Sequence, residues 1–253
     1  PTFVQGAQKV IYDLVADASH HLWVASSSGI LRIDGQTQEV RQFSENEGLS
    51  DFVVNRLLLD AHQNLWVATR KGLNYFDTKT HKISYFIQKN PENNDLNVAL
   101  GMAFDQKGQL WIAARGGLSV LDIPRRKFKT YTEKEGFSGN QCNYLYIDKA
   151  QNVWVSTQGY LLVLEAKNQN FRQYTVKDGL FGSFTYDRIS AVNDLLFVNF
   201  IGALSYFNPY KLLGYSTASP PVFTGFKLLD REVPFDRSKI ATNPFPIKYD
   251  QNI

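Results

Sequence analysis

The sequence has few of the residues that usually mark a redox, metal or catalytic centre. It contains one cysteine, Cys142, so no disulfide can form within the chain. The four histidines are scattered and do not have the spacing of metal ligands; they are His20, His21, His62 and His81. No set of serine, histidine and carboxylate residues with catalytic spacing emerges. The sequence therefore predicts no catalytic residue, no metal and no cofactor.

Long apolar runs and a strong charge excess are also lacking. No stretch approaches the roughly 18 apolar residues of a membrane-spanning helix. A formal net charge of +3 over 253 residues gives no case for nucleic-acid binding, which would need a concentrated basic stripe. The chain begins at Pro1 without the charged-then-apolar pattern of a signal peptide. We interpret it as a piece of a longer protein.

Aromatic residues, in contrast, are abundant and regularly spaced. They make up 14% of a chain that is 43% hydrophobic, which suits a globular, sheet-rich protein. Each of the four tryptophans lies in the same short apolar motif, and they are 43, 45 and 43 residues apart. They are Trp23, Trp66, Trp111 and Trp154. A further 43 residues leads to Phe197, which we interpret as a fifth, degenerate copy without a clear fourth strand after Pro209.

Each repeat contains four short apolar runs bounded by Asp, Asn and Gly, as expected for strands joined by tight turns. In the second repeat these runs cover residues 55–59, 65–69, 73–76 and 82–86. Four antiparallel strands recurring every forty-odd residues predict an all-β fold of β-propeller blades. We expect propeller repeats over 1–213, at about 10–52, 53–96, 97–139, 140–181 and 182–212, forming part of a larger propeller.

Three repeated positions have a physical reason in this fold. The tryptophan should fill the wedge between neighbouring blades and pair its N–H with a backbone carbonyl. The aspartate six residues earlier, such as Asp60, can fix the first turn by bonding to its own backbone. The glycine six residues later, such as Gly72, supplies a positive φ. The four tryptophans are therefore interpreted as structural, and Cys142, which occupies a position filled by Ile11, Val54 and Ala99 in other repeats, as a small core residue.

The composition changes after Leu213. Residues 214–221 are rich in small residues and proline, and we expect them to form a linker. Residues 222–253 read as the start of a further β domain, which is too short to hold a core of its own.

The repeat resembles a known family. The stretch from Asp60 to Thr69, followed by Gly72 to Asp77, fits an Asp-x-x-Gly-x-Leu-Trp-Val-Gly-Thr-x-x-Gly-Leu-x-x-Phe-Asp pattern, with alanine at position 68 where the family often has glycine. This pattern is that of the two-component regulator propeller repeat. The segment that enters residue 222 through Pro220 and Pro221 is similar to the immunoglobulin-like domain, named for three tyrosines, that follows such propellers.

The resemblance implies an extracytoplasmic, periplasmic sensor region of a membrane-bound bacterial signalling protein, with a histidine kinase or diguanylate cyclase output elsewhere. It implies binding of a ligand or partner without catalysis, with the rest of the sensor protein in cis and a homodimer in the intact protein. Relatives sense oligosaccharides, but a shared fold does not name the ligand. Two alternatives stay open: a propeller-fold carbohydrate-active enzyme or lyase, and a structural or dimerisation segment whose ligand site lies in upstream blades.

Propeller geometry points to candidate ligand-binding residues. The turns after the second strand of each blade and the connections between blades should share one face, where variable polar side chains could meet an oligosaccharide or an anionic ligand. These candidates are Arg70, Lys71, Arg115, Gln158, Asn140, Asn143 and Tyr186. The alternative is that they are ordinary solvated loop residues.

Overall fold

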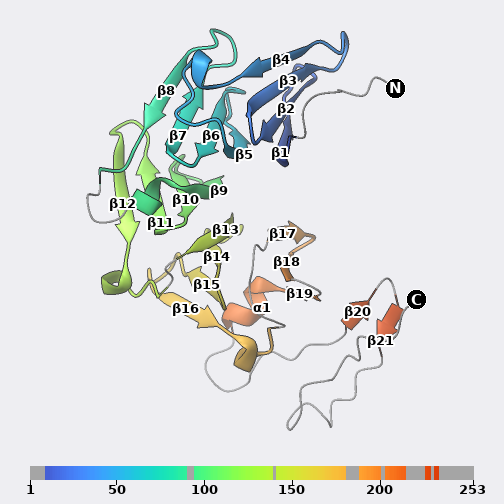
Figure 1. Ribbon diagram of the computed structural model, residues 1–253. Helices are drawn as coiled ribbons and strands as arrows, with labels where there is room; N and C mark the ends of the chain where they lie inside the picture. The colour runs from blue at the N-terminus through green and yellow to red at the C-terminus, as the bar shows by residue number, and fades with distance from the viewer. Residues whose placement is uncertain are drawn as a thin grey trace.

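The computed structural model describes residues 9–89, 94–138, 141–180, 188–200 and 203–214, and a short hairpin at 226–228 and 231–233. Within these residues the chain forms five small antiparallel sheets set around a common axis (Figure 1). This radial arrangement of small sheets is a β-propeller, as the sequence repeat predicted.

Four of the blades have four strands, which follow chain order from the axis outward. Blade 1 comprises β1 (Ile11–Ala16), β2 (His21–Ser26), β3 (Gly29–Asp34) and β4 (Val40–Phe43). Blade 2 comprises β5 (Val54–Leu59), β6 (Leu65–Thr69), β7 (Gly72–Phe76) and β8 (Ile83–Phe86). Blade 3 comprises β9 (Ala99–Phe104), β10 (Leu110–Ala114), β11 (Gly117–Asp122) and β12 (Lys127–Tyr131). Blade 4 comprises β13 (Cys142–Ile147), β14 (Val153–Thr157), β15 (Leu161–Leu164) and β16 (Phe171–Tyr174).

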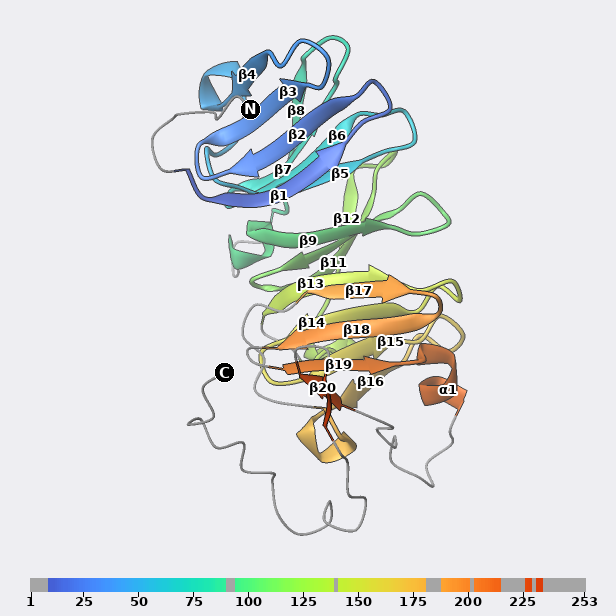
Figure 2. The same cartoon turned by 90° about the vertical axis from the view of Figure 1, so that its right-hand side faces the viewer.

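Blade 5 has three strands among the described residues. They are β17 (Ile189–Val192), β18 (Leu195–Phe200) and β19 (Ala203–Phe207). The helix α1 (Pro209–Gly214) follows where a fourth strand would begin, in agreement with the degenerate fifth repeat. Figure 2 shows blade 1 and blade 5 at opposite ends of the arc, with β9 of blade 3 visible between them.

The strand boundaries predicted for the second repeat agree with the structure to within one residue. The predicted run 65–69 coincides with β6, and the others differ from β5, β7 and β8 by one residue at their first position. Of the predicted C-terminal segment 222–253, only the hairpin β20 (Phe226–Leu228) and β21 (Arg231–Val233) lies within the described residues.

Short 3₁₀ turns lie in the connections between blades. They are η1 (Glu45–Glu47), η2 (Asn94–Asn97), η3 (Glu133–Glu135) and η4 (Val176–Asp178). In η1 the Ser44 side chain caps the turn while Glu47 bonds back to the Ser44 N–H, and Gly48 closes it at a φ of 102°. The same box recurs at Thr175 and Asp178 of η4. These turns explain the glycine that follows the fourth strand in three blades, at Gly48, Gly136 and Gly179, each with a positive φ.

The repeated aspartate has a double role that the sequence indicated only in part. In blade 4, Asp148 Oδ1 accepts the Asn152 backbone N–H at 2.9 Å, which fixes the turn as predicted. Its Oδ2 accepts the Trp154 indole N–H at 2.9 Å. The predicted backbone carbonyl partner of the indole was therefore wrong. A carboxylate is the stronger acceptor, because the hydrogen bond is charge-assisted.

The same arrangement recurs within blade 1 and within blade 3. Trp23 Nε1 donates to Asp17 at 2.8 Å, and Trp111 Nε1 donates to Asp105 at 3.0 Å. Burial opposes ionisation of Asp17, but the hydrogen bonds from Trp23 and His21 hold the pKa of its carboxyl below the ordinary value.

The tryptophans fill the wedges between blades. All four are buried, the most exposed being Trp111 at 7%. Each packs on the aromatic of its own fourth strand, and three reach an aromatic of the next blade as well. These cross-blade contacts are Trp23 with Phe76, Trp66 with Phe104, and Trp154 with Phe207, at 5.5, 6.5 and 5.5 Å between ring centroids.

The glycine after the second strand is required by both its backbone angle and its surroundings. Gly29 has a φ of 103°, and a Cβ added there would lie 2.1 Å from the Phe43 carbonyl oxygen. Because no side chain fits so close to a backbone atom, the β2–β3 turn admits only glycine at this position.

Removing the carboxylate of Asp148 should destabilise the fold. Asp148→Ala leaves the buried Trp154 N–H and Asn152 N–H without acceptors, so we expect a loss of about 3 kcal/mol in the free energy of unfolding. Asp148→Asn is the matched control, because its amide oxygen can still accept one of these bonds, and it should lose less. Urea unfolding followed by tryptophan fluorescence measures both; an Ala variant as stable as the wild type would contradict this role.

Candidate functional site

One face of the propeller carries the turns between the second and third strands and the connections between blades, as predicted from topology. We call it the loop face. The two kinds of segment touch there: Ser50 Oγ lies 2.9 Å from Thr69 Oγ1, and the Ser50 N–H donates to Asn74 Oδ1 at 2.9 Å. The connection between blades 1 and 2 is thus fastened to the second and third strands of blade 2.

The structure places the predicted ligand-binding residues on this face where it describes them. Arg70 and Lys71 form the β6–β7 turn, Arg115 lies in the β10–β11 turn, and Gln158 follows β14. Asn143 is the second residue of β13. Asn140 and Tyr186 lie outside the described residues, and their placement on the loop face stays a prediction.

Lys71 is already engaged by acidic groups. Its ammonium lies 3.3 Å from Asp51 and 3.7 Å from Glu45, both in the connection from blade 1. Its bond to Asp51 raises the pKa of Lys71. The Tyr85 hydroxyl donates to the Lys71 carbonyl. Sequence reasoning missed this pairing, because Asp51 and Lys71 are brought together only by the packing of consecutive blades.

The two candidate arginines of the loop face remain open to solvent. Arg70 and Arg115 are exposed, and neither guanidinium forms an ion pair with another residue in the described part of the chain. Gln158 is exposed as well. These three side chains occupy corresponding turns of three successive blades, so they offer donors to a ligand lying across the loop face.

Asn143 belongs to a bulge that recurs in the innermost strands. One extra residue interrupts the ladder at the same place in four blades, and these residues are Tyr12, Asn55, Leu100 and Asn143. Asn143 Oδ1 accepts from Gln141 Nε2 at 2.9 Å. A bulge frees backbone groups from the ladder and redirects the neighbouring side chains.

Those freed carbonyls take arginine donors at the centre of the ring. Arg56 Nε donates to the Leu100 carbonyl at 3.1 Å, and Arg188 Nη2 donates to the Tyr12 carbonyl at 3.2 Å. Both arginines also lie near Asp13, at 3.3 Å for Arg56 and 3.8 Å for Arg188.

We call Asp13, Arg56, Tyr144 and Arg188 the axial cluster. Register places all four at one level of the innermost strands, since their partners occupy the same position of the second strand. The Arg56 guanidinium lies 4.8 Å from the Tyr144 ring centroid, and burial lowers the pKa of Arg56. Arg56 therefore contacts blades 1, 3 and 4 from blade 2, and Asp13 extends the cluster to blade 5.

Sequence reasoning overlooked this cluster although a signal existed. The position ten residues before each tryptophan holds Asp13, Arg56, Gly101 and Tyr144, which is an unusually polar and variable set for an inner strand. Arg188 stands nine residues before Phe197, because the β17–β18 turn is one residue shorter than the equivalent turns.

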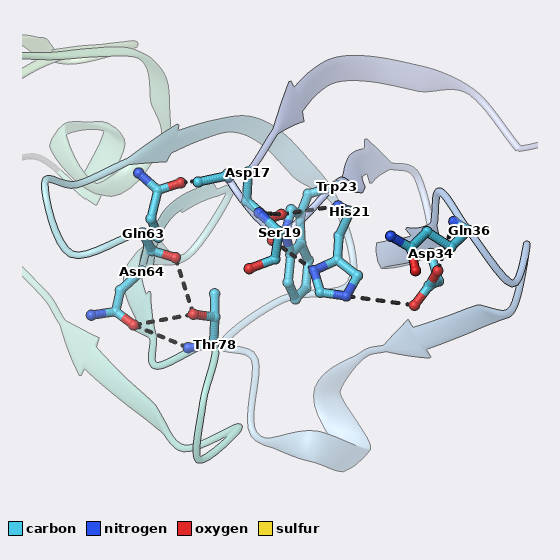
Figure 3. A network of polar contacts seen from close by, with 10 residues as sticks. Asp17, Ser19, His21, Trp23, Asp34, Gln36, Gln63, Asn64 and Thr78 are labelled. Atoms are coloured by element: carbon cyan, nitrogen blue, oxygen red, sulfur yellow. Dashed lines mark hydrogen bonds and ion pairs between the residues drawn. The ribbon is translucent and has the colours of Figure 1, made fainter.

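The opposite face carries a small cavity between blades 4 and 5. It has a volume of about 120 Å³ and is lined by Tyr146, Tyr210 and the ion pair of Lys149 with Asp194. This ion pair joins the first turns of two consecutive blades. Gln63 makes the equivalent link by accepting the Ala18 N–H at 2.8 Å (Figure 3).

His21, its two acidic neighbours and Cys142 have structural surroundings. His21 lies between Asp17, at 2.9 Å, and Asp34, at 3.7 Å (Figure 3). Both carboxylates also accept turn N–H groups, so this arrangement is part of the turn framework. Burial raises the pKa of the Cys142 thiol, which makes it a poor nucleophile. In the described part of the chain no three His, Cys, Asp or Glu residues cluster in a way that could hold a metal.

Comparison with solved structures shows related folds at low identity. The extracellular domain of BT3049 from B. thetaiotaomicron, described as a hybrid two-component system, matches at 20% identity and a TM-score of 0.72. The alignment covers 91% of this chain and 33% of that one. PorZ, a surface component of the type-IX secretion system of Porphyromonas gingivalis, matches at 18% identity and a TM-score of 0.60, over 81% of this chain and 33% of PorZ.

An enzyme is also among the matches. XC5397, a gluconolactonase from Xanthomonas campestris, matches at 10% identity and a TM-score of 0.55, over 75% of this chain and 68% of that one. No protein-family model matches the chain, and no curated protein does. These likenesses define the class as a β-propeller, and the chain spans about a third of the BT3049 domain and of PorZ. No helix of the described residues has the length and apolarity to cross a bilayer.

Removing the central cation of the axial cluster should weaken the whole ring. Arg56→Met leaves the Asp13 carboxylate, whose side chain is 17% exposed, without its nearest cationic partner. Breaking a largely buried pair from one side costs about 3 kcal/mol of unfolding free energy.

The matched control is the double variant Asp13→Asn with Arg56→Met, which removes both charges and should recover much of the loss. Urea unfolding of the two single variants and the double gives the coupling energy. Additive losses would show that the two residues act independently and would contradict the cluster.

Proposed function

We propose that the chain is part of the extracytoplasmic input module of a membrane-bound bacterial signal-transduction protein, and that it binds a ligand or partner without catalysis. The observation that carries the proposal is the match to the BT3049 extracellular domain over 91% of this chain. The resemblance of the sequence repeat to the two-component regulator propeller repeat supports it independently.

The arrangement of polar groups is compatible with binding. Exposed donors gather on the loop face at Arg70, Arg115 and Gln158, while the buried carboxylates serve turns and indoles. A ligand rich in hydroxyl or carboxylate groups, such as an acidic oligosaccharide, suits guanidinium donors in adjacent blades. Under this proposal the immunoglobulin-like segment, a membrane anchor, an output domain and a homodimer belong to the intact protein, and the module lies in the periplasm.

A propeller enzyme is the second candidate, favoured by the match to the gluconolactonase XC5397. The arrangement of His21, Asp17 and Asp34 argues against it, because both acids are engaged by turn N–H groups. A third candidate is a structural or dimerisation segment whose ligand site lies in other blades.

The two loop-face arginines provide the test of the sensor proposal. The wild-type chain is screened by thermal shift against neutral oligosaccharides, acidic oligosaccharides and organic acids, and Kd is then measured for each compound that stabilises it. Arg70→Ala with Arg115→Ala should weaken binding by about tenfold or more, because two charge-assisted donors are lost.

Lys149→Ala, on the opposite face, is the control and should leave Kd unchanged. Unchanged affinity in the double arginine variant would contradict the proposed loop-face site. A folded wild-type chain without any response would favour the structural candidate, and conversion of a bound compound would favour the enzyme.

A further inference from the structure

Two arginines face each other on the outer strands of blade 1. Arg32 on β3 and Arg41 on β4 are directly opposite in the antiparallel register. The imidazole of His81, from the β7–β8 turn of blade 2, lies next to them, with Nδ1 3.3 Å from Arg41 Nη1. Like charges directly across a strand pair are destabilising unless another group neutralises them.

The nearby carboxylates are held by turn N–H groups and form no ion pair with the two arginines. Asp77 is the acid whose charge acts on His81, but its Oδ1 accepts the backbone N–H groups of Lys79 and Thr80. Glu47 accepts the Ser44 N–H and hydroxyl through Oε2. These bonds, and also the charge of Arg41, lower the pKa of Glu47. Neither forms an ion pair with Arg32 or Arg41.

One donor of this cluster is buried without a partner. Arg32 Nε is shielded from solvent and makes no hydrogen bond to any described residue. An orphaned guanidinium N–H is costly, and the cost is removed when an acceptor is bound.

Blade 4 has an arginine at the same repeat position as Arg41, and there the arginine has an acidic partner. Arg172 of β16 corresponds to Arg41 in the repeat, and it pairs with Glu165 at 2.7 Å. In blade 1 the equivalent acid, Asp34, takes turn N–H groups and faces His21 instead. In blade 1 both residues are present, but Arg41 and Asp34 do not form the equivalent ion pair.

The walls of the cluster favour a strong interaction with an anion. The His81 ring lies 5.4 Å from the Phe43 ring and 5.9 Å from the Phe76 ring. The Arg41 guanidinium lies 4.8 Å from the Phe43 ring centroid. Apolar rings lower the local dielectric constant, which strengthens attraction between a guanidinium and an oxyanion.

We propose that Arg32, Arg41 and His81 form an oxyanion-binding site at the outer contact between blades 1 and 2. Its ligand is a sulfate, phosphate or carboxylate group, free or carried by a larger molecule. The guanidinium groups supply paired donors to the anion, and His81 supplies one ring nitrogen. This site is separate from the loop-face residues and does not depend on the proposed sensor function.

Binding should be coupled to protonation of His81. In the free protein, burial and the charges of Arg41 and Arg32 lower the pKa of His81, while Asp77 opposes them. A bound anion favours the protonated imidazole, so it should raise the pKa of His81 and bind more tightly as pH falls through that range. The uncharged rings of Phe43 and Phe76 do not titrate.

The test uses the 253-residue chain and histidine side-chain NMR. Sodium sulfate, phosphate and acetate are titrated separately at constant ionic strength set with sodium chloride, and the His81 resonance is assigned with His81→Gln. A saturable shift of that resonance and an increase in its pKa are expected. Sulfate or phosphate acting alone identifies a tetrahedral anion, and acetate acting alone identifies a carboxylate.

Arg32→Gln with Arg41→Gln should weaken binding by at least about tenfold, since two charge-assisted donors are lost. Arg41→Gln alone, at an exposed position, keeps the test valid if the double variant fails to fold. Arg172→Gln is the matched control and should bind as the wild type. No saturable shift with any anion, equal affinity in the Arg41 variants, or an equal loss in the Arg172 variant would overturn the site.

Discussion

The hydrogen bond from an indole N–H to a turn carboxylate is the interaction on which this architecture depends. The carboxylate of Asp148 fixes the first turn of its blade with one oxygen and holds Trp154 with the other. The fixed indole then packs on Phe207 of the next blade. Turn geometry, strand pairing and blade packing are thereby set by one pair of residues, and the pair is repeated in blades 1 and 3.

The framework and the variable groups occupy different places. The repeated residues are buried between blades, where a change creates a cavity or an unpaired group. Residues that differ between repeats lie at blade ends, on the axis and along outer strands, where the repeat itself does not fix their identity. Arg56 and Asp13 form an ion pair on the axis, and Arg70 and Arg115 lie in solvent on the loop face. The exposed loop-face residues can therefore vary without disturbing the fold, whereas the axial pair cannot.

The fold could be predicted from sequence because its signals are local and repeated. The tryptophan period counted the blades, and turn residues located β6 to the residue. Partners brought together by blade packing could not be predicted. Asp51 reaches Lys71 through the connection between blades, and Arg188 reaches Tyr12 from the other end of the chain. The predicted partner of the indole was wrong for a different reason: the contact is local, but nothing in the sequence shows that the second oxygen of a turn carboxylate accepts the indole N–H.

The claim that the chain binds a ligand without converting it is tested most directly by following a compound that binds the chain. A compound that gives a saturable thermal shift is incubated with the protein, recovered, and analysed by mass spectrometry, while NMR shifts identify the residues it touches. The account predicts a chemically unchanged compound and shifts confined to the loop face around Arg70 and Arg115 or to the cluster of Arg32, Arg41 and His81. Recovery of a converted product, or shifts confined to the cavity between blades 4 and 5, would contradict it.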